Sequence, residues 1–227
     1  MSVAIVTGCT RGVGYAIAKR LSQKYTIIGC GSTAHTVADT QKRHPEWDIQ
    51  LYDLSQKKEV IGFADYVLSN YPEIQLLVNN AGRFMPGRLY DETDEVYEQM
   101  LAINLSSAYY LTKRLLPTFM KQRNGLIINI ASIASIAAYP NGSSYSIAKA
   151  GLLSFSRNLR EQLKSYHVGV TAVLLGATLT RSWEGAPYPP ERFIAPETVA
   201  EIVWTISQLP PSAVVEEIVI RPMLGDL

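Results

Sequence analysis

The fold of this chain is decided by residues 3–14, Val3-Ala4-Ile5-Val6-Thr7-Gly8-Cys9-Thr10-Arg11-Gly12-Val13-Gly14. The apolar, β-branched start predicts a buried strand over Val3–Thr7, and an amphipathic helical pattern follows over Gly14–Lys24. Glycines in such a turn permit tight bending and let backbone amides approach a pyrophosphate, which the helix N-terminus attracts through its dipole. The alternative is a glycine-rich turn that only redirects the chain.

The rest of the chain alternates short apolar runs with longer amphipathic stretches, which is typical of a parallel sheet wrapped by helices. Further strands are expected at Thr26–Gly29, Asp48–Tyr52, Gln75–Asn79, Leu126–Ile130, Gly169–Leu175 and Val214–Ile220. Further helices are expected at Thr36–His44, Gln56–Asn70, Thr93–Gln122, Ser144–Ser165 and Pro196–Ser207, with a capped start at Thr93 and a first-turn proline at Pro196. No repeat or linker divides the chain, so we expect one domain over 1–227. Its only irregular insertion of any length is expected at Arg181–Ala195.

Composition excludes several classes of protein. The chain has 227 residues, of which 47% are hydrophobic and 18% charged, as in a globular domain with a sizeable core. The net charge of +1 gives no reason to expect a nucleic acid or an anionic membrane as partner. The two cysteines, Cys9 and Cys30, make no metal pattern, and Met1-Ser2-Val3-Ala4 does not resemble a signal peptide. No apolar run approaches the roughly 18 residues of a membrane span. We therefore expect a cytoplasmic protein with free thiols, no metal and no membrane contact.

Tyr145 and Lys149 lie four residues apart in a predicted helix and therefore share one face. An ammonium held there would stabilise a tyrosinate and lower a phenol pKa that is normally about 10. The tyrosine would then donate or accept a proton near neutral pH. The alternative is a chance pair on an exposed helix, which this spacing by itself does not exclude.

Several motifs share one order along the chain: the glycine turn, Asn79-Asn80-Ala81-Gly82 after the fourth strand, Asn104, Ser132, and Tyr145 with Lys149. In this order the chain resembles the short-chain dehydrogenase/reductase family. The resemblance extends over nearly the whole chain and weakens after about Thr180. It is strongest to the smaller members, among them bacterial carbonyl reductases and 3-oxoacyl carrier-protein reductases. It implies a single-domain Rossmann fold, that is, a doubly wound parallel α/β sheet of about seven strands flanked by helices.

The resemblance also implies a mechanism in which a nicotinamide hydride adds to a carbonyl carbon. Tyr145 matches the general acid, and Ser132 would hydrogen-bond the same oxygen. Lys149 would bind the nicotinamide ribose and lower the tyrosine pKa, and Asn104 would hold a water relay. The alternative for Asn104 is an amide that is satisfied locally within its helix. Ser132 is preferred to Ser135, which would line the substrate cleft, because Ser132 follows the strand directly and stands thirteen residues before Tyr145, as in the family.

Cofactor preference depends on the end of the second strand, where NAD-specific sites usually carry an acid that binds the ribose 2′-hydroxyl. Here Ile28-Gly29-Cys30-Gly31-Ser32-Thr33 has none, and Asp39 falls inside the next predicted helix. Ser32 and Thr33 would donate hydrogen bonds to a 2′-phosphate, and Arg11 would supply positive charge. We therefore predict NADP(H) in preference to NAD(H). Alternatively Arg11 is a solvated loop residue, and His35 is a further, weaker candidate contact.

By resemblance, other positions also match cofactor contacts. These are the turn residues Gly8, Thr10, Arg11, Gly12, Val13 and Gly14; Asp53 and Leu54 at the adenine; Asn80, Ala81 and Gly82 beneath the ribose; and Gly176, Thr178 and Thr180 at the carboxamide. Asn79 is expected to tie the neighbouring strand. Asp53 would alternatively cap the following helix. The family's usual proline is missing before Gly176, where this chain has Leu175.

Residues 181–195 are expected to form a substrate lid. The lid contains Trp183, Tyr188 and Phe193, which favour an apolar or aromatic carbonyl compound, although rings in a short lid also pack on their own domain. Arg83, Arg88 and Arg181 would receive an acidic substrate, unless they are solvated loop arginines.

The predicted helices that carry Asn104 and Tyr145 pack against a second subunit in the family, so a homodimer or homotetramer is expected. Candidate contacts are Leu101, Leu105, Tyr109, Leu152, Phe155 and Leu159, unless these side chains face their own sheet. The sequence thus predicts a carbonyl/alcohol oxidoreductase that uses NADP(H) and a small-molecule substrate. The alternatives are an NAD-dependent alcohol dehydrogenase of the same family and a non-catalytic nucleotide-sensing protein.

Overall fold

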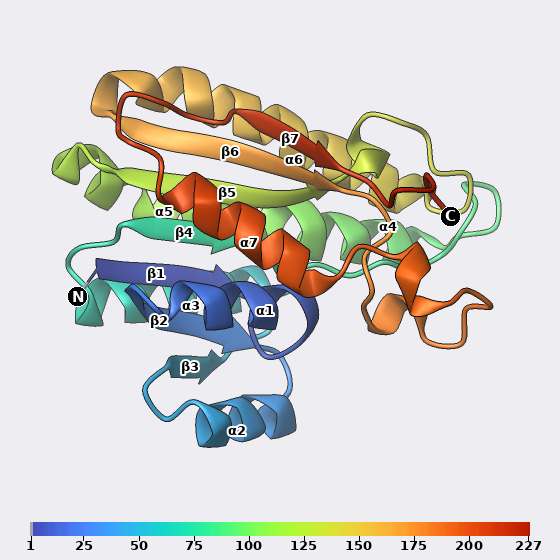
Figure 1. Ribbon diagram of the computed structural model, residues 1–227, viewed down its shortest axis with the longest axis horizontal. Coiled ribbons are helices and arrows are strands. Elements are labelled where there is room, and N and C mark those ends of the chain that lie inside the picture. Colours follow the sequence, from blue (N-terminus) through green and yellow to red (C-terminus); the bar gives the residue numbers. More distant parts are fainter. Residues whose placement is uncertain (1) are drawn as a thin grey trace.

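The computed structural model (Figure 1) describes residues 2–227; Met1, which opens the segment considered above for a signal peptide, lies outside them. A parallel sheet of seven strands in the order β3-β2-β1-β4-β5-β6-β7 forms its centre. The strands are β1 (Ser2–Thr7), β2 (Tyr25–Gly31), β3 (Asp48–Leu51), β4 (Leu76–Asn79), β5 (Gly125–Ser132), β6 (Val168–Leu175) and β7 (Glu217–Ile220). The doubly wound seven-stranded fold predicted from the sequence is confirmed.

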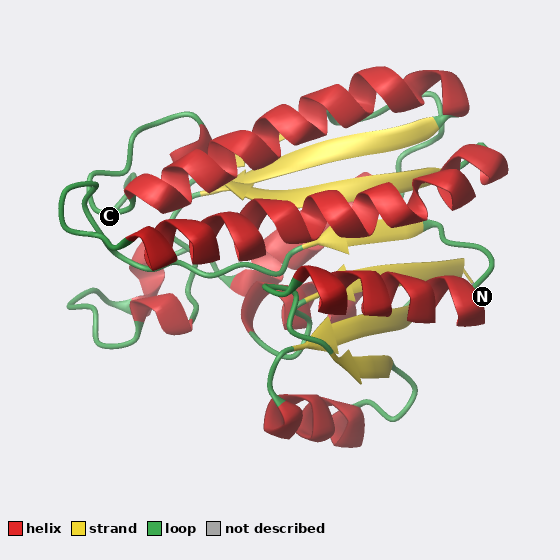
Figure 2. Ribbon diagram, turned by 180° about the vertical axis from the view of Figure 1, so that it is seen from behind, coloured by secondary structure: helices red, strands yellow, loops and turns green. Residues whose placement is uncertain are grey.

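Helices cover both faces of the sheet. They are α1 (Gly12–Leu21), α2 (Ala34–Arg43), α3 (Lys57–Asn70), α4 (Asp94–Leu101), α5 (Ser107–Gln122), α6 (Ser143–Leu163) and α7 (Pro196–Ser207). A π-helical segment, η1 (Ala102–Ser106), joins α4 to α5, and short 3₁₀ turns lie at η2 (Ile133–Ser135), η3 (Lys164–Tyr166), η4 (Arg181–Trp183) and η5 (Pro190–Arg192). Helices α1 and α7 pack together on one face (Figure 1), and α3, α5 and α6 cover the other (Figure 2).

Each face of the sheet has its own hydrophobic core, because alternate residues of a strand point to opposite sides. In β1, Ala4 and Val6 pack under α1 and α7, whereas Val3 and Ile5 pack under α3 and α5. Burial on both faces explains why this strand is apolar throughout rather than alternating.

The boundaries of most elements differ by one to three residues from the sequence-based expectation, and the differences at α4–α5, β7 and residues 80–93 matter most. The predicted helix over 93–122 is divided by the π-helical turn η1, and its start at Thr93 carries no side-chain cap, although Pro196 does begin α7 as predicted. Strand β7 is shorter than predicted because it is an edge strand that pairs only with the last four residues of β6. The expectation of one irregular insertion is wrong, since residues 80–93 also form neither helix nor strand. Instead, Gly87 of that segment forms an isolated bridge to Gly142, just before α6.

Of the six apolar side chains proposed for subunit contacts, two are buried and four, Leu101, Leu105, Tyr109 and Phe155, are partly or fully exposed. Leu152 and Leu159 are only 2% and 3% exposed and belong to the protein's own core, so for these two the prediction is wrong: α6 turns them toward the sheet. Tyr109 is 41% exposed on α5, and its ring lies 5.5 Å from that of Phe155 on α6. The outer surface that α5 and α6 share around these two rings therefore remains a candidate subunit contact.

Across residues 2–227, the helices are too short or too polar for any of them to cross a membrane.

Candidate active site

A cleft of about 600 Å³ lies at the carboxyl ends of the strands. The sheet order places β2 and β4 on either side of β1. From β2 the chain continues outward to β3, and from β4 it continues outward to β5 on the opposite side. In open α/β sheets a crevice forms at such a reversal, and ligands bind there. The cleft runs from the β2 end, past the glycine turn, to the ends of β5 and β6.

The glycine turn after β1 is shaped for a close ligand. Gly8 and Gly12 have φ angles of 65° and 56°, a region that side chains disfavour. A Cβ on Gly14 would lie 2.3 Å from the Gly8 carbonyl oxygen, so only glycine lets α1 begin this close to the strand. Thr10, Arg11 and Val13 line the cleft with these glycines. Since α1 begins at Gly12 without a side-chain cap, its first amides are free to bind an anion.

The end of β2 carries no carboxylate, as the sequence indicates. Ser32 and Thr33 are exposed and line the cleft, and Arg11 lines it from the glycine turn. Asp39 lies within α2, where it pairs with the Arg43 guanidinium at 3.0 Å. His35 is exposed and does not belong to the cleft lining, so the structure does not place it as a contact.

Asp53 and Leu54 line the cleft after β3. One Asp53 carboxylate oxygen accepts hydrogen bonds from the Ser55 amide at 3.0 Å and from the Ser55 hydroxyl at 2.8 Å. The helix-capping alternative for Asp53 is wrong, because α3 has its N-cap at Gln56 and the carboxylate stabilises the turn before it.

The segment after β4 is tied to β1. The Thr7 hydroxyl accepts hydrogen bonds from the amides of Asn80 and Ala81, both at 2.9 Å, and the Asn80 side chain donates to the Thr7 carbonyl at 2.9 Å. Asn80, Ala81 and Gly82 all line the cleft. Asn79 is structural, as predicted: its side-chain nitrogen donates to Asn129 on the neighbouring strand β5 at 2.8 Å.

Ser132, Tyr145, Lys149 and Asn104 lie together along the same cleft. Ser132 is the last residue of β5, and Tyr145 and Lys149 share one face of α6. The Ser132 hydroxyl lies near the Tyr145 phenol and lowers its pKa, and it accepts a hydrogen bond from the Ala134 amide at 3.1 Å. The Lys149 ammonium is buried, donates to the Ile130 carbonyl at 2.9 Å and lies 5.7 Å from the centroid of the Tyr145 ring.

The pKa values of this pair are governed by burial. Burial raises the pKa of Tyr145, and the nearby Ser132 hydroxyl offsets this only in part. Burial lowers the pKa of Lys149 to about 8. The direction for Tyr145 differs from the sequence-based expectation of a lowered pKa, because desolvation of the phenol is the largest influence and the ammonium is directed to the Ile130 carbonyl.

Asn104 lies in the π-helical turn between α4 and α5. Its side-chain nitrogen donates to the Arg83 carbonyl at 2.8 Å and to the Met100 carbonyl at 3.1 Å, and its side-chain oxygen accepts from the Arg83 amide at 3.1 Å. The local alternative therefore holds in part, through Met100, but most of the amide's bonds fix the segment after Gly82. The oxygen has two lone pairs and can still accept a bond from a water molecule.

Ser135 is not a cleft residue, contrary to the role suggested for it. Its hydroxyl donates to the Lys149 carbonyl at 2.9 Å, which holds α6 against the turn after β5.

The turn after β6 lacks the expected proline but is supported from another part of the chain. Gly176, Thr178 and Thr180 line the cleft. The Gly176 amide donates to the Ile220 carbonyl at 2.8 Å, and a Cβ on Gly176 would lie 3.0 Å from the Pro222 ring and 3.1 Å from an Asp226 carboxylate oxygen. The C-terminal segment therefore packs directly on this turn.

The half of the cleft beside Tyr145, called the substrate half below, is lined only in part by the lid that the sequence predicts over residues 181–195. Trp183 lines it, whereas Phe193 is buried behind Trp183 with ring centroids 5.1 Å apart, and Tyr188 packs on Phe193 instead of lining the cleft. Arg83 and Arg181 line the cleft. Arg88 does not; its guanidinium donates to the Tyr90 hydroxyl at 2.8 Å.

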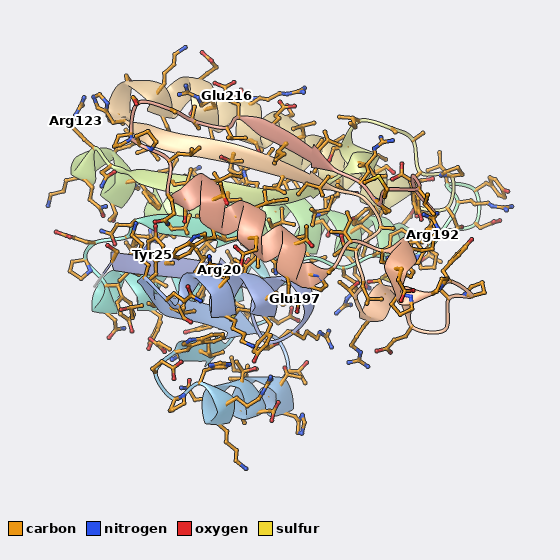
Figure 3. All side chains as sticks on the ribbon, in the orientation of Figure 1. Arg20, Tyr25, Arg123, Arg192, Glu197 and Glu216 are labelled. Carbon is orange, nitrogen blue, oxygen red and sulfur yellow. The ribbon has the colours of Figure 1, made fainter. Side chains whose placement is uncertain are left out.

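Sequence reasoning missed several residues that line the cleft, among them Phe84, Tyr139, Asn141, Asp226 and Leu227. Arg192, labelled beside the C-terminal segment in Figure 3, donates from the lid to the Gly225 carbonyl at 3.4 Å. The one local sequence signal for these cleft residues is the aromatic side chain of Phe84, two residues after Gly82. No local sequence pattern identifies Asp226 as a cleft residue, because its position depends on how residues 221–227 pack against the turn after β6.

The described residues 2–227 contain no cluster of three or more His, Cys, Asp or Glu side chains that would hold a metal ion.

Comparison with known proteins agrees with this geometry. Residues 2–187 match the sequence profile described as short chain dehydrogenase. The chain is 31% identical to a 3-oxoacyl-acyl-carrier-protein reductase of Haemophilus influenzae over 78% of this chain and 74% of that protein. A metagenomic short-chain oxidoreductase in complex with NADP superimposes with a TM-score of 0.85 at 26% identity, over 99% of this chain and 98% of that one. An alcohol dehydrogenase from Thermococcus sibiricus, complexed with 5-hydroxy-NADP, superimposes with a TM-score of 0.87 at 25% identity, over 98% and 97%.

Proposed function

Because this chain belongs to the short-chain dehydrogenase family and is an oxidoreductase, we propose that it transfers hydride between NADP(H) and a carbonyl or alcohol substrate. The observation that carries the proposal is one cleft with a glycine turn beside its centre and Ser132, Tyr145 and Lys149 on its wall. A dinucleotide fits such a cleft, because the turn offers free amides at the start of α1 and leaves no side chain on Gly14.

In this proposal the cofactor supplies the hydride, and the side chains handle the charge and the proton. Tyr145 donates its proton to the carbonyl oxygen as negative charge develops there. The Ser132 hydroxyl donates to the same oxygen and orients the substrate. Lys149, whose ammonium has donors beyond the one used on Ile130, binds the nicotinamide ribose. Asn104 keeps the segment after Gly82 against the cleft and holds a water through which Tyr145 regains its proton.

We propose NADP(H) over NAD(H) because the end of β2, where the adenosine ribose would bind, has donors and a nearby cation but no carboxylate. Ser32, Thr33 and Arg11 all face the cleft at this end. A carboxylate there would repel a 2′-phosphate, whereas a guanidinium attracts it. The two NADP-complexed structural relatives support this choice.

We also propose a homodimer or homotetramer in the cytoplasm. The outer surface of α5 and α6 around Tyr109 and Phe155 is the candidate contact. Cys9 and Cys30 are buried free thiols, as expected in a reducing compartment.

The test is oxidation of NADPH and of NADH over a panel of ketones, aldehydes, quinones and 3-oxoacyl thioesters, with Tyr145→Phe as the control variant. We expect NADPH to be consumed by the wild type and not by Tyr145→Phe, which should still bind NADPH. A clear preference for NADH would contradict the cofactor proposal. Binding of NADPH without turnover of any substrate would favour the nucleotide-sensing alternative.

A further inference from the structure

The Tyr145 ring contacts Phe84, and Phe84 in turn contacts Tyr139. The Phe84 ring meets the Tyr145 ring edge to face, with centroids 5.2 Å apart and planes at 86°. Phe84 also meets Tyr139 edge to face, at 5.7 Å and 72°. All three rings line the cleft. Edge-to-face pairs at such distances are favourable and have a preferred geometry, so each ring restricts the orientation of the next.

The Phe84 ring is fixed from behind by Gly142. A Cβ on Gly142 would lie 2.8 Å from the Phe84 ring and 3.1 Å from the Tyr139 ring, so the rings occupy the space that any other residue would fill. The backbone is held as well, since the Gly87 amide donates to the Asn141 carbonyl at 3.1 Å and the Ser143 amide donates to the Gly87 carbonyl at 3.3 Å.

Two side chains extend this attachment. The Ser144 hydroxyl donates to the Glu92 carboxylate, and Asn104 bonds both the amide and the carbonyl of Arg83, which precedes Phe84. Residues 80–93 are therefore joined at both ends, to η1 by Asn104 and to the first turn of α6 by Ser144. Tyr145 is the next residue along that turn.

From this arrangement we propose that Phe84 is a positioning residue for Tyr145: its ring edge holds the phenol toward Ser132 and keeps water from the side of the ring that faces segment 80–93. The inference rests on the proposed function. The other polar groups that face Tyr145 are Ser132 from β5 and Lys149 from α6, with Tyr139 behind Phe84 and Asp226 near Tyr139. Phe84 adds an apolar, orienting contact to this otherwise polar set.

The principal test compares Phe84→Ala and Phe84→Leu with the wild type on the best substrate and on a two-carbon aldehyde too small to reach Phe84. We expect kcat of Phe84→Ala to fall about two- to tenfold on both compounds, which is the rate equivalent of one aromatic pair. KM for NADPH should not change. Phe84→Leu should recover part of the loss, because it restores apolar cover without the ring edge. Tyr90→Ala, in the same segment but exposed and outside the cleft, is the matched control and should behave as the wild type.

A second readout does not require turnover. Burial raises the pKa of Tyr145, so admission of water in Phe84→Ala should lower it. NMR of protein labelled at the tyrosine ring carbon, with the Tyr145 signal assigned by its loss in Tyr145→Phe, measures this pKa directly. The alkaline limb of the reduction rate should move to lower pH with it, because the reaction needs the protonated phenol.

Gly142→Ala displaces the Phe84 ring without removing it and guards against a folding defect of Phe84→Ala. It should reproduce the fall in kcat and the shift in the Tyr145 pKa. The proposal is overturned if Phe84→Ala loses activity only on large substrates, which would make Phe84 a substrate contact. It is also overturned if the Tyr145 pKa is the same in Phe84→Ala and the wild type. If no substrate is reduced by any variant, the proposed function fails, and the NMR titration still decides the role of Phe84.

Discussion

Adding one methyl group at Gly14 should separate two tasks of the glycine turn, which are packing α1 against β1 and the proposed binding of the cofactor. In Gly14→Ala the new Cβ would lie 2.3 Å from the Gly8 carbonyl oxygen and 2.4 Å from the Asn80 side-chain nitrogen. Ordinary contacts are longer than 3.4 Å, so the start of α1 must move away from the turn by about an ångström.

The magnitude follows from two opposing contributions. Overpacking against a backbone atom costs about 1–3 kcal/mol. Alanine is favoured over glycine in a helix by about 0.5–1 kcal/mol. The free energy of unfolding should therefore fall by about 1 kcal/mol and at most by about 2.5 kcal/mol, which lowers the melting temperature by about 2–10 °C in a domain of this size. Affinity for NADPH should fall more than tenfold, because the displaced amides no longer converge on the pyrophosphate.

Gly62→Ala is the matched control. Gly62 lies within α3, and a Cβ there would come no closer than 3.2 Å to the Tyr52 ring, which is a side chain that can adjust. This variant should be as stable as the wild type or more stable, and it should bind NADPH normally. Thermal unfolding and NADPH fluorescence titration measure both quantities. The reasoning is refuted if Gly14→Ala matches Gly62→Ala in both assays.

Three further variants test the site. Ser132→Ala should reduce kcat at least about tenfold while NADPH still binds, because a donor to the reacting oxygen is lost; steady-state kinetics and NADPH titration measure this. Ser32→Asp should weaken NADPH and strengthen NADH, because a carboxylate repels the 2′-phosphate and accepts from the 2′-hydroxyl; the ratio of kcat/KM for the two cofactors reports it. Lys149→Met should abolish turnover but raise the free energy of unfolding by about 3 kcal/mol at pH 7, which is the free-energy equivalent of a lysine pKa lowered from 10.5 to about 8. Since the pKa of Lys149 is lowered to about 8 in the fold, the charged lysine destabilises the wild type below pH 8, and the advantage of methionine should disappear as pH rises toward 10.5; denaturant unfolding across this range decides it.

The sequence predicts well those parts of the molecule that local patterns determine. The strand, turn and helix over residues 2–21 follow from apolar residues and from glycines whose positive φ angles no side chain favours. Tyr145 and Lys149 share a face because α6 is regular across them. The same local patterns fail where a distant contact decides. The helix expected over 93–122 is interrupted because Asn104 satisfies its amide on Arg83, twenty-one residues away.

The substrate half of the cleft shows this limit most clearly, because segments that are far apart in the sequence build it. Phe84 comes from the segment after β4, Trp183 from the lid, and Asp226 from the segment after β7. Phe84 is placed by Gly142, and Asp226 is placed by its approach to Gly176 and by the Arg221 guanidinium of its own segment at 3.1 Å. The turn after β6 has no proline of its own, but the Pro222 ring packs against Gly176 in this turn. Pro222 thereby restricts the turn as a proline within it would. Changes in residues 221–227 should therefore alter both substrate choice and the geometry at the carboxamide end of the cofactor.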